Sequence, residues 1–298
     1  MAIVATTPSI EILPKQANPL WQFVKSQPLG VAGFLIILVY VVCALGARWI
    51  APYDPEAIDF GAMLARPGEA HYFGTDQYGR DVFSRIVYGA RTALAVGILS
   101  ALFGCTIGAL VGAASGYFGG RIDNAIQRVV DVLLSFPIIV LAMVVVAVLG
   151  KRSAFGVDWN LIAAIALPMI PKMARVARSS TLSIVAMPFI DAARAAGFSH
   201  TRIILRHIVP NIVAPYLIMV TAFMAQAILL EASLSFLGLG VTEPTPAWGL
   251  MLSGTSADFY QSAPWMILFP GMAITLAVFA FNLFGDSLRD WLDPKLKS

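Results

Sequence analysis

The chain has 298 residues, of which 58% are hydrophobic and 12% are charged, and its formal net charge is +3. Soluble domains average about 45–50% apolar and about 25% charged residues, so this chain cannot cover its surface with charge in water. The composition excludes a water-soluble domain and predicts an all-α integral membrane protein. The small net charge gives no indication of a nucleic-acid partner.

The amino-terminal segment, residues 1–28, carries Lys15 and Lys25 among Pro, Gln, Asn and Ser, and is predicted to be a loose cytoplasmic tail. The apolar run that follows, Leu29–Ile50, is long enough to cross a bilayer and has further spans after it. We therefore interpret it as an uncleaved transmembrane helix and not as a signal peptide. Residues 29–90 are expected to contain this helix and a periplasmic segment.

Six apolar stretches meet or approach the length of about 20 residues that a helix needs to cross the hydrocarbon core. In chain order they are Leu29–Ile50, Thr92–Tyr117, Val132–Leu149, Trp159–Val176, Ile212–Leu239 and Pro264–Phe284. The third and fourth are short, and prolines leave the end of the fourth open by several residues. Neighbouring helices can absorb such breaks in a membrane bundle.

Basic residues near the span ends predict the orientation, because loops rich in Lys and Arg stay in the cytoplasm. The segment between the fourth and fifth spans holds one acidic residue and six basic ones, which are Lys172, Arg175, Arg178, Arg194, Arg202 and Arg206. The segment between the fifth and sixth has neither Lys nor Arg, and the first loop is acidic on balance. Six spans with both termini in the cytoplasm satisfy this pattern, although Lys151 and Arg152 then fall on the outer side.

Between the second and third spans, the apolar residues from Arg121 to Val130 recur at helical spacing, with polar residues on the opposite face. This pattern predicts an amphipathic helix at the cytoplasmic interface that leads into the third span. Such a helix would either pack within the chain or make a second contact with a cytoplasmic partner.

The second span contains Gly97, Gly104, Gly108, Gly112 and Gly116. Glycines four residues apart on a transmembrane helix allow a neighbouring helix to approach closely. The neighbour could belong to the same subunit or to a sister subunit, and direct contact with substrate is a third use.

The cytoplasmic loop 177–211 contains a predicted helix–turn–helix. Alanine and arginine favour a helix from Phe189, and Gly197 is placed to end it by adopting a left-handed conformation. Ser199 is then expected to cap a second helix, Thr201–Ile208, which Pro210 would terminate.

This loop has the chemistry of a docking element. Ala192 and Ala193 would let a partner surface approach closely, and Asp191, Arg194 and Arg202 could make charged contacts around them. Basic cytoplasmic loops usually do no more than determine topology, so composition alone leaves both interpretations open.

The loop resembles the EAA motif of bacterial ABC importer permeases, through Asp191–Ala193, Gly197 and Ile208–Pro210. In that family the motif forms the coupling helix, which lies in a groove of the ATPase subunit. The resemblance therefore implies that Asp191, Ala192, Ala193, Arg194, Gly197, Arg202 and Pro210 belong to an ATPase-coupling loop. This chain departs from the motif in having Asp where Glu is usual and in a compressed Ile-Val-Pro ending.

Further segments are similar to permeases of dipeptide, oligopeptide and nickel importers, in particular to the second, C-type subunit. They are Ala51–Pro55, Phe73–Asp81, Glu231–Gly240, Pro244–Gly249, Asn282–Asp286 and Leu292–Pro294. The resemblance implies a type I ABC importer permease fold. Its transmembrane core would cover residues 91–285, and residues 286–298 would form a cytoplasmic tail.

The same resemblance implies the partners. They would be a homologous permease forming a heterodimeric pore, two ATPase subunits, a periplasmic substrate-binding protein and membrane lipid, in the inner membrane of a bacterium. The cargo would be peptides or similar small solutes. ATP and Mg would be bound by the ATPase partners and no cofactor by this chain, because Gly150–Ser153 lacks the upstream glycine of a nucleotide-binding P-loop. We expect a pore subunit and no enzyme.

Glu231 lies inside the fifth span, where a charge costs about 2.5–3.5 kcal/mol on insertion scales. It is either part of a translocation path or a structural carboxyl that bonds to Ser233, Ser235 or a neighbouring helix. A lone intramembrane acid gives little support to the alternative of an ion-coupled secondary transporter, which usually shows paired charges. The three histidines have no ligand spacing, and no metal is assigned.

Overall fold

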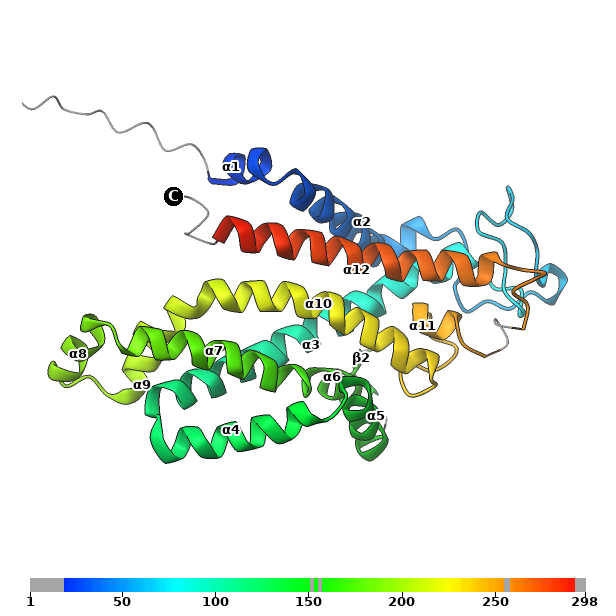
Figure 1. Cartoon of the computed structure of the whole chain (residues 1–298). Helices are drawn as coiled ribbons and strands as arrows, with labels where there is room; N and C mark the ends of the chain where they lie inside the picture. The colour runs from blue at the N-terminus through cyan, green and yellow to red at the C-terminus, as the bar shows by residue number, and fades with distance from the viewer. Residues whose placement is uncertain (1–18, 151–152, 155–156, 255–257, 293–298) are drawn as a thin grey trace, which may run out of the picture.

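The computed structural model describes residues 19–150, 153–154, 157–254 and 258–292. Within these ranges the regular secondary structure is helical apart from one short antiparallel pair, β1 (Ser153–Ala154) and β2 (Val157–Asp158), and an isolated bridge between Thr75 and Asp81. The axes of the long helices are roughly aligned with one another (Figure 1). The short helices α8 (Pro188–Ala195) and α9 (His200–Ile203) lie at one end of this bundle. The segment that follows α2 and the short helix α11 (Trp248–Met251) lie at the other end.

Four helical stretches in the described part are long and apolar enough to cross a membrane. They are α2 (Pro28–Ile50), α3 (Val82–Phe118), the run His200–Phe236 that ends in α10 (Val213–Phe236), and α12 (Trp265–Leu292). Two bent pairs bring the total to six: α4 (Gly120–Ser135) with α5 (Ile138–Leu149), and α6 (Trp159–Ala166) with α7 (Met169–Val185). The predicted number of six spans agrees with the upper count, in which each bent pair is one span and the third and fourth spans are broken helices.

The third predicted span, Val132–Leu149, is not one straight helix. It is divided between α4 and α5, which meet at 96° where Pro137 precedes the first residue of α5. Proline lacks the backbone N–H that a continuous helix would use, so a sharp break at this position is expected. With only 12 residues, α5 cannot cross the hydrocarbon core alone.

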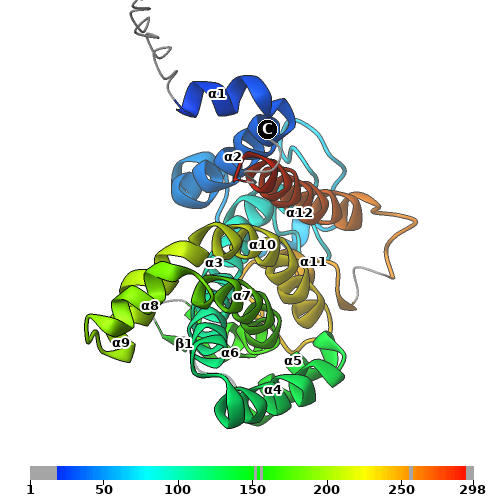
Figure 2. The same ribbon diagram turned by 60° about the vertical axis from the view of Figure 1, so that its left-hand side comes forward.

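The position predicted for the amphipathic helix is wrong. The residues do form a helix, α4, but it runs beside α3 and α7 and not across their ends (Figures 1 and 2). Its polar side faces inward, because Asp123 receives hydrogen bonds from Arg178 (2.6 Å) and Ser115. The hydrophobic residues Ile122, Val129 and Val132 are exposed on the outward side.

Several helix ends lie beyond the predicted limits. The fourth span bends by 45° between α6 and α7, where proline was expected to disturb it, but α7 continues to Val185. The last helix, α12, extends to Leu292, into the segment predicted as a tail. A short helix, α1 (Pro19–Ser26), occupies part of the predicted loose amino-terminal tail. Hydropathy detects the apolar part of a helix and not the polar turns that continue it outside the membrane.

The glycines of α3 pack within the subunit. A Cβ added at Gly104 would collide with Ala166 and Met169, and one added at Gly108 would collide with Ile170 and Met173. Gly112 and Gly116 meet the next turns of α7 in the same way. The close approach therefore joins α3 to the bent pair α6–α7, and the sister-subunit alternative is not needed for these four glycines.

The segment between α2 and α3 folds back over the end of the bundle. The indole of Trp265, at the start of α12, donates a hydrogen bond to the carbonyl of Thr75 at 3.0 Å. The ring of Phe73 stacks on Phe269 with 4.0 Å between centroids. Trp248 of α11 in turn donates to the carbonyl of Ile86 at 2.9 Å. Aromatic side chains thus attach this segment to α12, and α11 to α3.

Candidate coupling surface

The helix α8 begins and ends with strong local signals. Pro188 lies in its first turn, where the missing N–H costs nothing. At the other end Gly197 has φ +75°, as predicted. Its N–H bonds to the carbonyl of Arg194 at 2.9 Å, and the N–H of Phe198 bonds to that of Ala193 at 3.1 Å. This pair of bonds is a Schellman motif, which ends a helix and turns the chain sharply.

The two faces of α8 differ. Ile190 and Ala193, three residues apart, are buried, with Ala193 only 6% exposed in the core of the chain. Asp191, Ala192 and Arg194 are exposed on the other face. The expectation that both alanines meet a partner is therefore wrong for Ala193, since the i, i+3 spacing turns it inward.

Both polar and apolar side chains are exposed on α8 and on residues near it, at this end of the molecule. We call this exposed set the coupling surface, and it consists of Met187, Phe189, Asp191, Ala192, Arg194 and Leu205. Arg194 donates to Asp191 at 3.3 Å, and both side chains remain accessible. Exposed ion pairs of this kind contribute little to stability, so these charges stay available to a partner.

The second helix of the loop is confirmed in position but does not end as predicted. Ser199 accepts a hydrogen bond from the N–H of Arg202 at 3.4 Å and caps α9. The guanidinium of Arg202 lies 3.9 Å from the ring centroid of Phe198. The chain then continues through a π-turn, Ile204–Ile208, and a 3-10 turn, Val209–Ile212, directly into α10.

Pro210 therefore does not terminate a helix. It lies in the first turn of the 3-10 segment, where its missing N–H is tolerated. The wider π-turn before Pro210 shifts the backbone hydrogen-bond register, and the helical run continues through it. As a result the coupling loop and the fifth span form one helical run, His200–Phe236.

A contact that the sequence did not indicate joins the loop to α3. The hydroxyl of Tyr117, in the last turn of α3, lies 2.8 Å from Nδ1 of His200. The guanidinium of Arg194 lies 5.6 Å from the centroid of the same Tyr117 ring. A single tyrosine at a helix end carries no pattern that predicts a partner 83 residues away.

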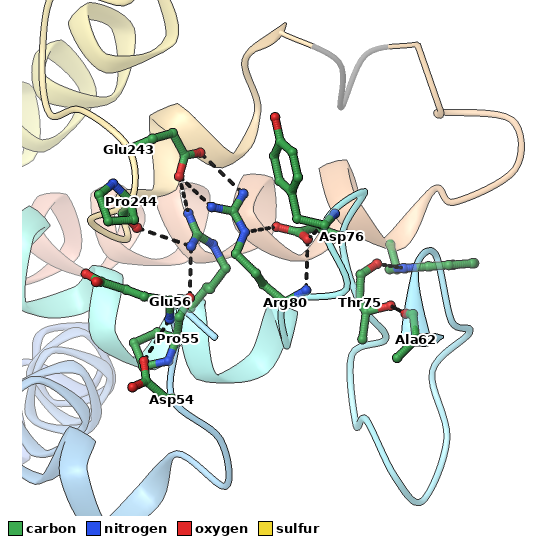
Figure 3. A network of polar contacts seen from close by, with 12 residues as sticks. Asp54, Pro55, Glu56, Ala62, Thr75, Asp76, Arg80, Glu243 and Pro244 are labelled. Carbon is green, nitrogen blue, oxygen red and sulfur yellow. Dashed lines mark hydrogen bonds and ion pairs between the residues drawn. The ribbon is translucent and has the colours of Figure 1, made fainter. Parts of the chain in front are cut away.

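At the opposite end, charged side chains connect the segment after α2 with the loop between α10 and α11 (Figure 3). Arg80 donates to both carboxylate oxygens of Glu243, at 2.5 and 3.3 Å, and to Asp76 at 2.6 Å. Burial opposes the charge of Arg80, but these two acids outweigh it and raise the pKa of the guanidinium. Arg85 donates to the carbonyls of Pro55 and Pro244. We call Asp76, Arg80, Arg85 and Glu243 the outer network.

Glu231 is almost completely buried within the chain, at 1% exposed. Its carboxylate accepts a hydrogen bond from Ser235 at 2.7 Å, and the Ser235 oxygen accepts the N–H of Val241 at 3.2 Å. This chain of bonds ties the end of α10 to the loop that follows. This geometry favours a structural role for the Glu231 carboxylate over a place on a translocation path.

Among the described residues, no three His, Cys, Asp or Glu side chains gather where they could hold a metal ion. Lys151 and Arg152, which fall on the outer side in the predicted topology, lie outside the described residues.

Comparison with known proteins identifies the family. Residues 104–298 match the family described as binding-protein-dependent transport system inner membrane component, and residues 19–67 match the N-terminal TM domain of oligopeptide transport permease C. The chain is 44% identical over 278 residues to the glutathione transport system permease protein GsiD of Escherichia coli O6:K15:H31 (strain 536 / UPEC), covering 93% of this chain and 90% of that protein.

Two further proteins agree. The dipeptide transport system permease protein DppC of Alkalihalophilus pseudofirmus (strain ATCC BAA-2126 / JCM 17055 / OF4) is 43% identical over 274 residues, which are 92% of this chain and 88% of that protein. A chain of the inward-facing MetNI methionine ABC transporter superposes with a TM-score of 0.55 at 19% identity, over 71% of this chain and 98% of that one. The second likeness shows the fold alone.

Both relatives are transport permeases that cover nearly the whole chain, and the fold matches that of an ABC transporter subunit. These findings exclude the alternative of an ion-coupled secondary transporter. The chain therefore belongs to the family of inner membrane components of binding-protein-dependent transport systems and is a permease subunit of an ABC importer.

Proposed function

We propose that this chain and a homologous permease together form a heterodimeric pore for short peptides, in the inner membrane of a bacterium. The names of the two relatives, for glutathione and for dipeptides, support this class of cargo. A periplasmic binding protein delivers the peptide to the pore. ATP and Mg are bound by two ATPase subunits, and this chain itself contributes no nucleotide or metal site and catalyses no reaction.

The coupling surface is the proposed contact with the ATPase. Its support is the fixed orientation of α8: Ile190 and Ala193 are buried in the chain, and Asp191, Ala192 and Arg194 face away from it. Around them, Met187, Phe189 and Leu205 expose large apolar side chains at this end of the molecule. An exposed apolar patch with a charged rim is typical of a protein–protein contact.

A coupling contact must pull on the membrane spans to drive transport. A ligand or partner shifts a conformational equilibrium only through contacts that differ between the two states. The loop is continuous with α10 through the helical run His200–Phe236, and it touches the end of α3 through Tyr117. Movement of α8 by the ATPase subunits would therefore reach two spans directly.

The topology that we propose has both termini in the cytoplasm. The helix α1 and the end of α12 lie toward the same end of the molecule as α8 and α9 (Figure 1). The basic residues of loop 177–211 are near this end. Because Lys and Arg near span ends prefer the cytoplasmic side, they support a cytoplasmic location for this end. The outer network then faces the periplasm and the binding protein.

The proposal is tested by filling the surface at Ala192. In a complex reconstituted with both permeases, both ATPases and the binding protein, Ala192→Trp is expected to lower peptide transport at least tenfold, because the large ring prevents close docking. Ala57→Trp, on an exposed residue of the outer segment, is the matched control and should stay within twofold of wild type. Wild-type transport by the Ala192→Trp complex would contradict the proposed contact.

A further inference from the structure

Two cavities adjoin at the end of α2 that lies away from the coupling surface. The larger, about 610 Å³, lies between the last turn of α2, the residues after it, and α3. Its charged and aromatic lining residues are Arg48, Tyr53, Asp54, Glu56, Tyr88 and Arg91. The smaller, about 420 Å³, is a groove between α2 and α3, and it shares Arg91 with the first.

The smaller groove is apolar apart from that arginine. It is lined by Val41, Ala44, Leu45, Leu94, Ala95 and Ile98. Leu45 is 73% exposed on its wall, whereas Ala44 and Leu94 are buried at its base. The groove is thus open along the side of two membrane spans, where a hydrocarbon chain is the surrounding solvent.

Arg91 is incompletely paired at the junction of the two cavities. Its Nε donates to the carbonyl of Ala44 at 2.5 Å, and its guanidinium lies 5.0 Å from the centroid of Tyr88. A guanidinium has five N–H donors, and within the described part of the chain this side chain makes only that one hydrogen bond. The remaining donors are available to an acceptor in the cavities.

The depth of the Arg91 guanidinium along the membrane spans determines whether its charge needs an anionic partner. Ala44 lies six residues before the end of α2, which is about 9 Å at 1.5 Å per residue. Arg48 lies in the last turn of the same helix and is exposed. A cation at this depth is costly unless it meets an anion or reaches the polar interface. The two arginines are therefore at the level of lipid headgroups, directly above an apolar groove.

We propose that these two cavities bind one glycerophospholipid of the leaflet opposite the coupling surface. The phosphate contacts the guanidinium groups of Arg48 and Arg91, since planar arginine donors match phosphate oxygens. One acyl chain lies in the groove between α2 and α3. Asp54 and Glu56, which also line the larger cavity, contact a cationic amine, so that the preferred headgroup is phosphoethanolamine.

The lipid would fill the space between α2 and the rest of the bundle. α2 is the least buried of the four long candidate spans, with 17% of its apolar 18-residue window buried in the described chain. An acyl chain bridging Leu45 and Ala95 would add apolar contact at the outer half of this helix. The inference depends only on the membrane placement and stands apart from the ATPase contact.

Native mass spectrometry of the purified, fully assembled transporter tests the proposal. With phosphatidylethanolamine added, the wild-type complex is expected to retain one lipid that the variant carrying Arg48→Gln and Arg91→Gln retains at least tenfold less. Arg66→Gln is the control, because Arg66 is an exposed arginine of the segment between α2 and α3 and lines neither cavity. Ala95→Phe, which fills the groove and changes no charge, should also displace the lipid.

Four results would overturn the proposal. They are equal lipid retention by the double-arginine variant and wild type, stronger retention of phosphatidylglycerol than of phosphatidylethanolamine, displacement of the lipid by millimolar inorganic phosphate, and a cross-link to the sister permease from a photoreactive residue at Leu45. A lipid cross-link from Leu45 would support it. If Arg91→Gln prevents assembly, Arg48→Gln and Ala95→Phe still test lipid binding. Neither the Arg48 nor the Ala95 side chain makes a hydrogen bond in the described structure, so these two changes break none.

Discussion

Two buried charged side chains show how single residues contribute to the structure. Arg85 and Glu231 are each 1% exposed, yet their surroundings differ. Arg85 bonds to two carbonyls and lies beside Glu243, so it joins separate segments of the chain. Among the described residues, the Glu231 carboxylate has one hydrogen-bond partner, Ser235, one helical turn away. The first residue therefore organises tertiary structure, and the second shapes the end of its own helix.

Glu231→Gln is expected to leave peptide transport within about twofold of wild type. Glutamine has the same shape and its carbonyl can still accept the hydrogen bond from Ser235, so the turn to Val241 is retained. The measurement is the initial rate and half-saturating peptide concentration of the reconstituted complex. A loss of transport in correctly assembled complex would show instead that the charge lies on the path.

Arg80→Ala is expected to destabilise the protein by about 1.5–3 kcal/mol, the range for hydrogen bonds to charged groups. Arg80 joins Asp76 to Glu243, and its removal separates the outer segment from the loop before α11. Thermal unfolding of the purified complex measures the effect, with Arg66→Ala as control. An unchanged unfolding midpoint would mean that the network adds no net stability.

The sequence indicated some of these residues and not others. The left-handed Gly197 and the capping Ser199 follow from local backbone chemistry, and both were predicted correctly. The burial of Ala193 required knowledge of how α8 rotates on the core. The contact of Tyr117 with His200 joins residues 83 positions apart, and no local pattern encodes it.

The packing of helix α3 on helix α7 shows how secondary-structure elements contribute to the fold. Glycines on one face of α3 bring it against the backbone of α7, including the carbonyl of Ala174. Hydropathy located the helices, because the apolar length alone identifies a span. It could not predict the 96° turn between α4 and α5, since Pro137 permits a bend but tertiary packing determines its angle.

Gly112→Ala is expected to destabilise the bundle by about 1–3 kcal/mol, because the added Cβ would overlap the backbone of Ala174 and push α7 away. Gly271→Ala is the matched control within α12, where an added Cβ meets nothing within 4 Å. Unfolding of the two complexes in denaturant gives the difference. Equal stability of the two variants would contradict the close packing of α3 on α7.

At the scale of the whole molecule, the two surface regions described above are separated by the length of the long helices (Figure 1). The coupling surface, α1 and the end of α12 are at one end, and the outer network is at the other (Figure 1). Charge distribution predicted this separation from the sequence, since the basic loop and the acidic loop fall on opposite sides. If the ATPase subunits contact α8 as proposed, their effect has to travel through the helices to reach the outer end.

The most direct test of this account is the side of the membrane on which the coupling surface lies. In a variant with Cys43 and Cys105 replaced by Ala, the single substitution Ala192→Cys should resist a membrane-impermeant thiol reagent in intact cells, and should cross-link to the ATPase subunit in the isolated complex. Ala57→Cys should react in intact cells. Labelling of Ala192→Cys from outside the cell, or no cross-link to the ATPase, would contradict the account.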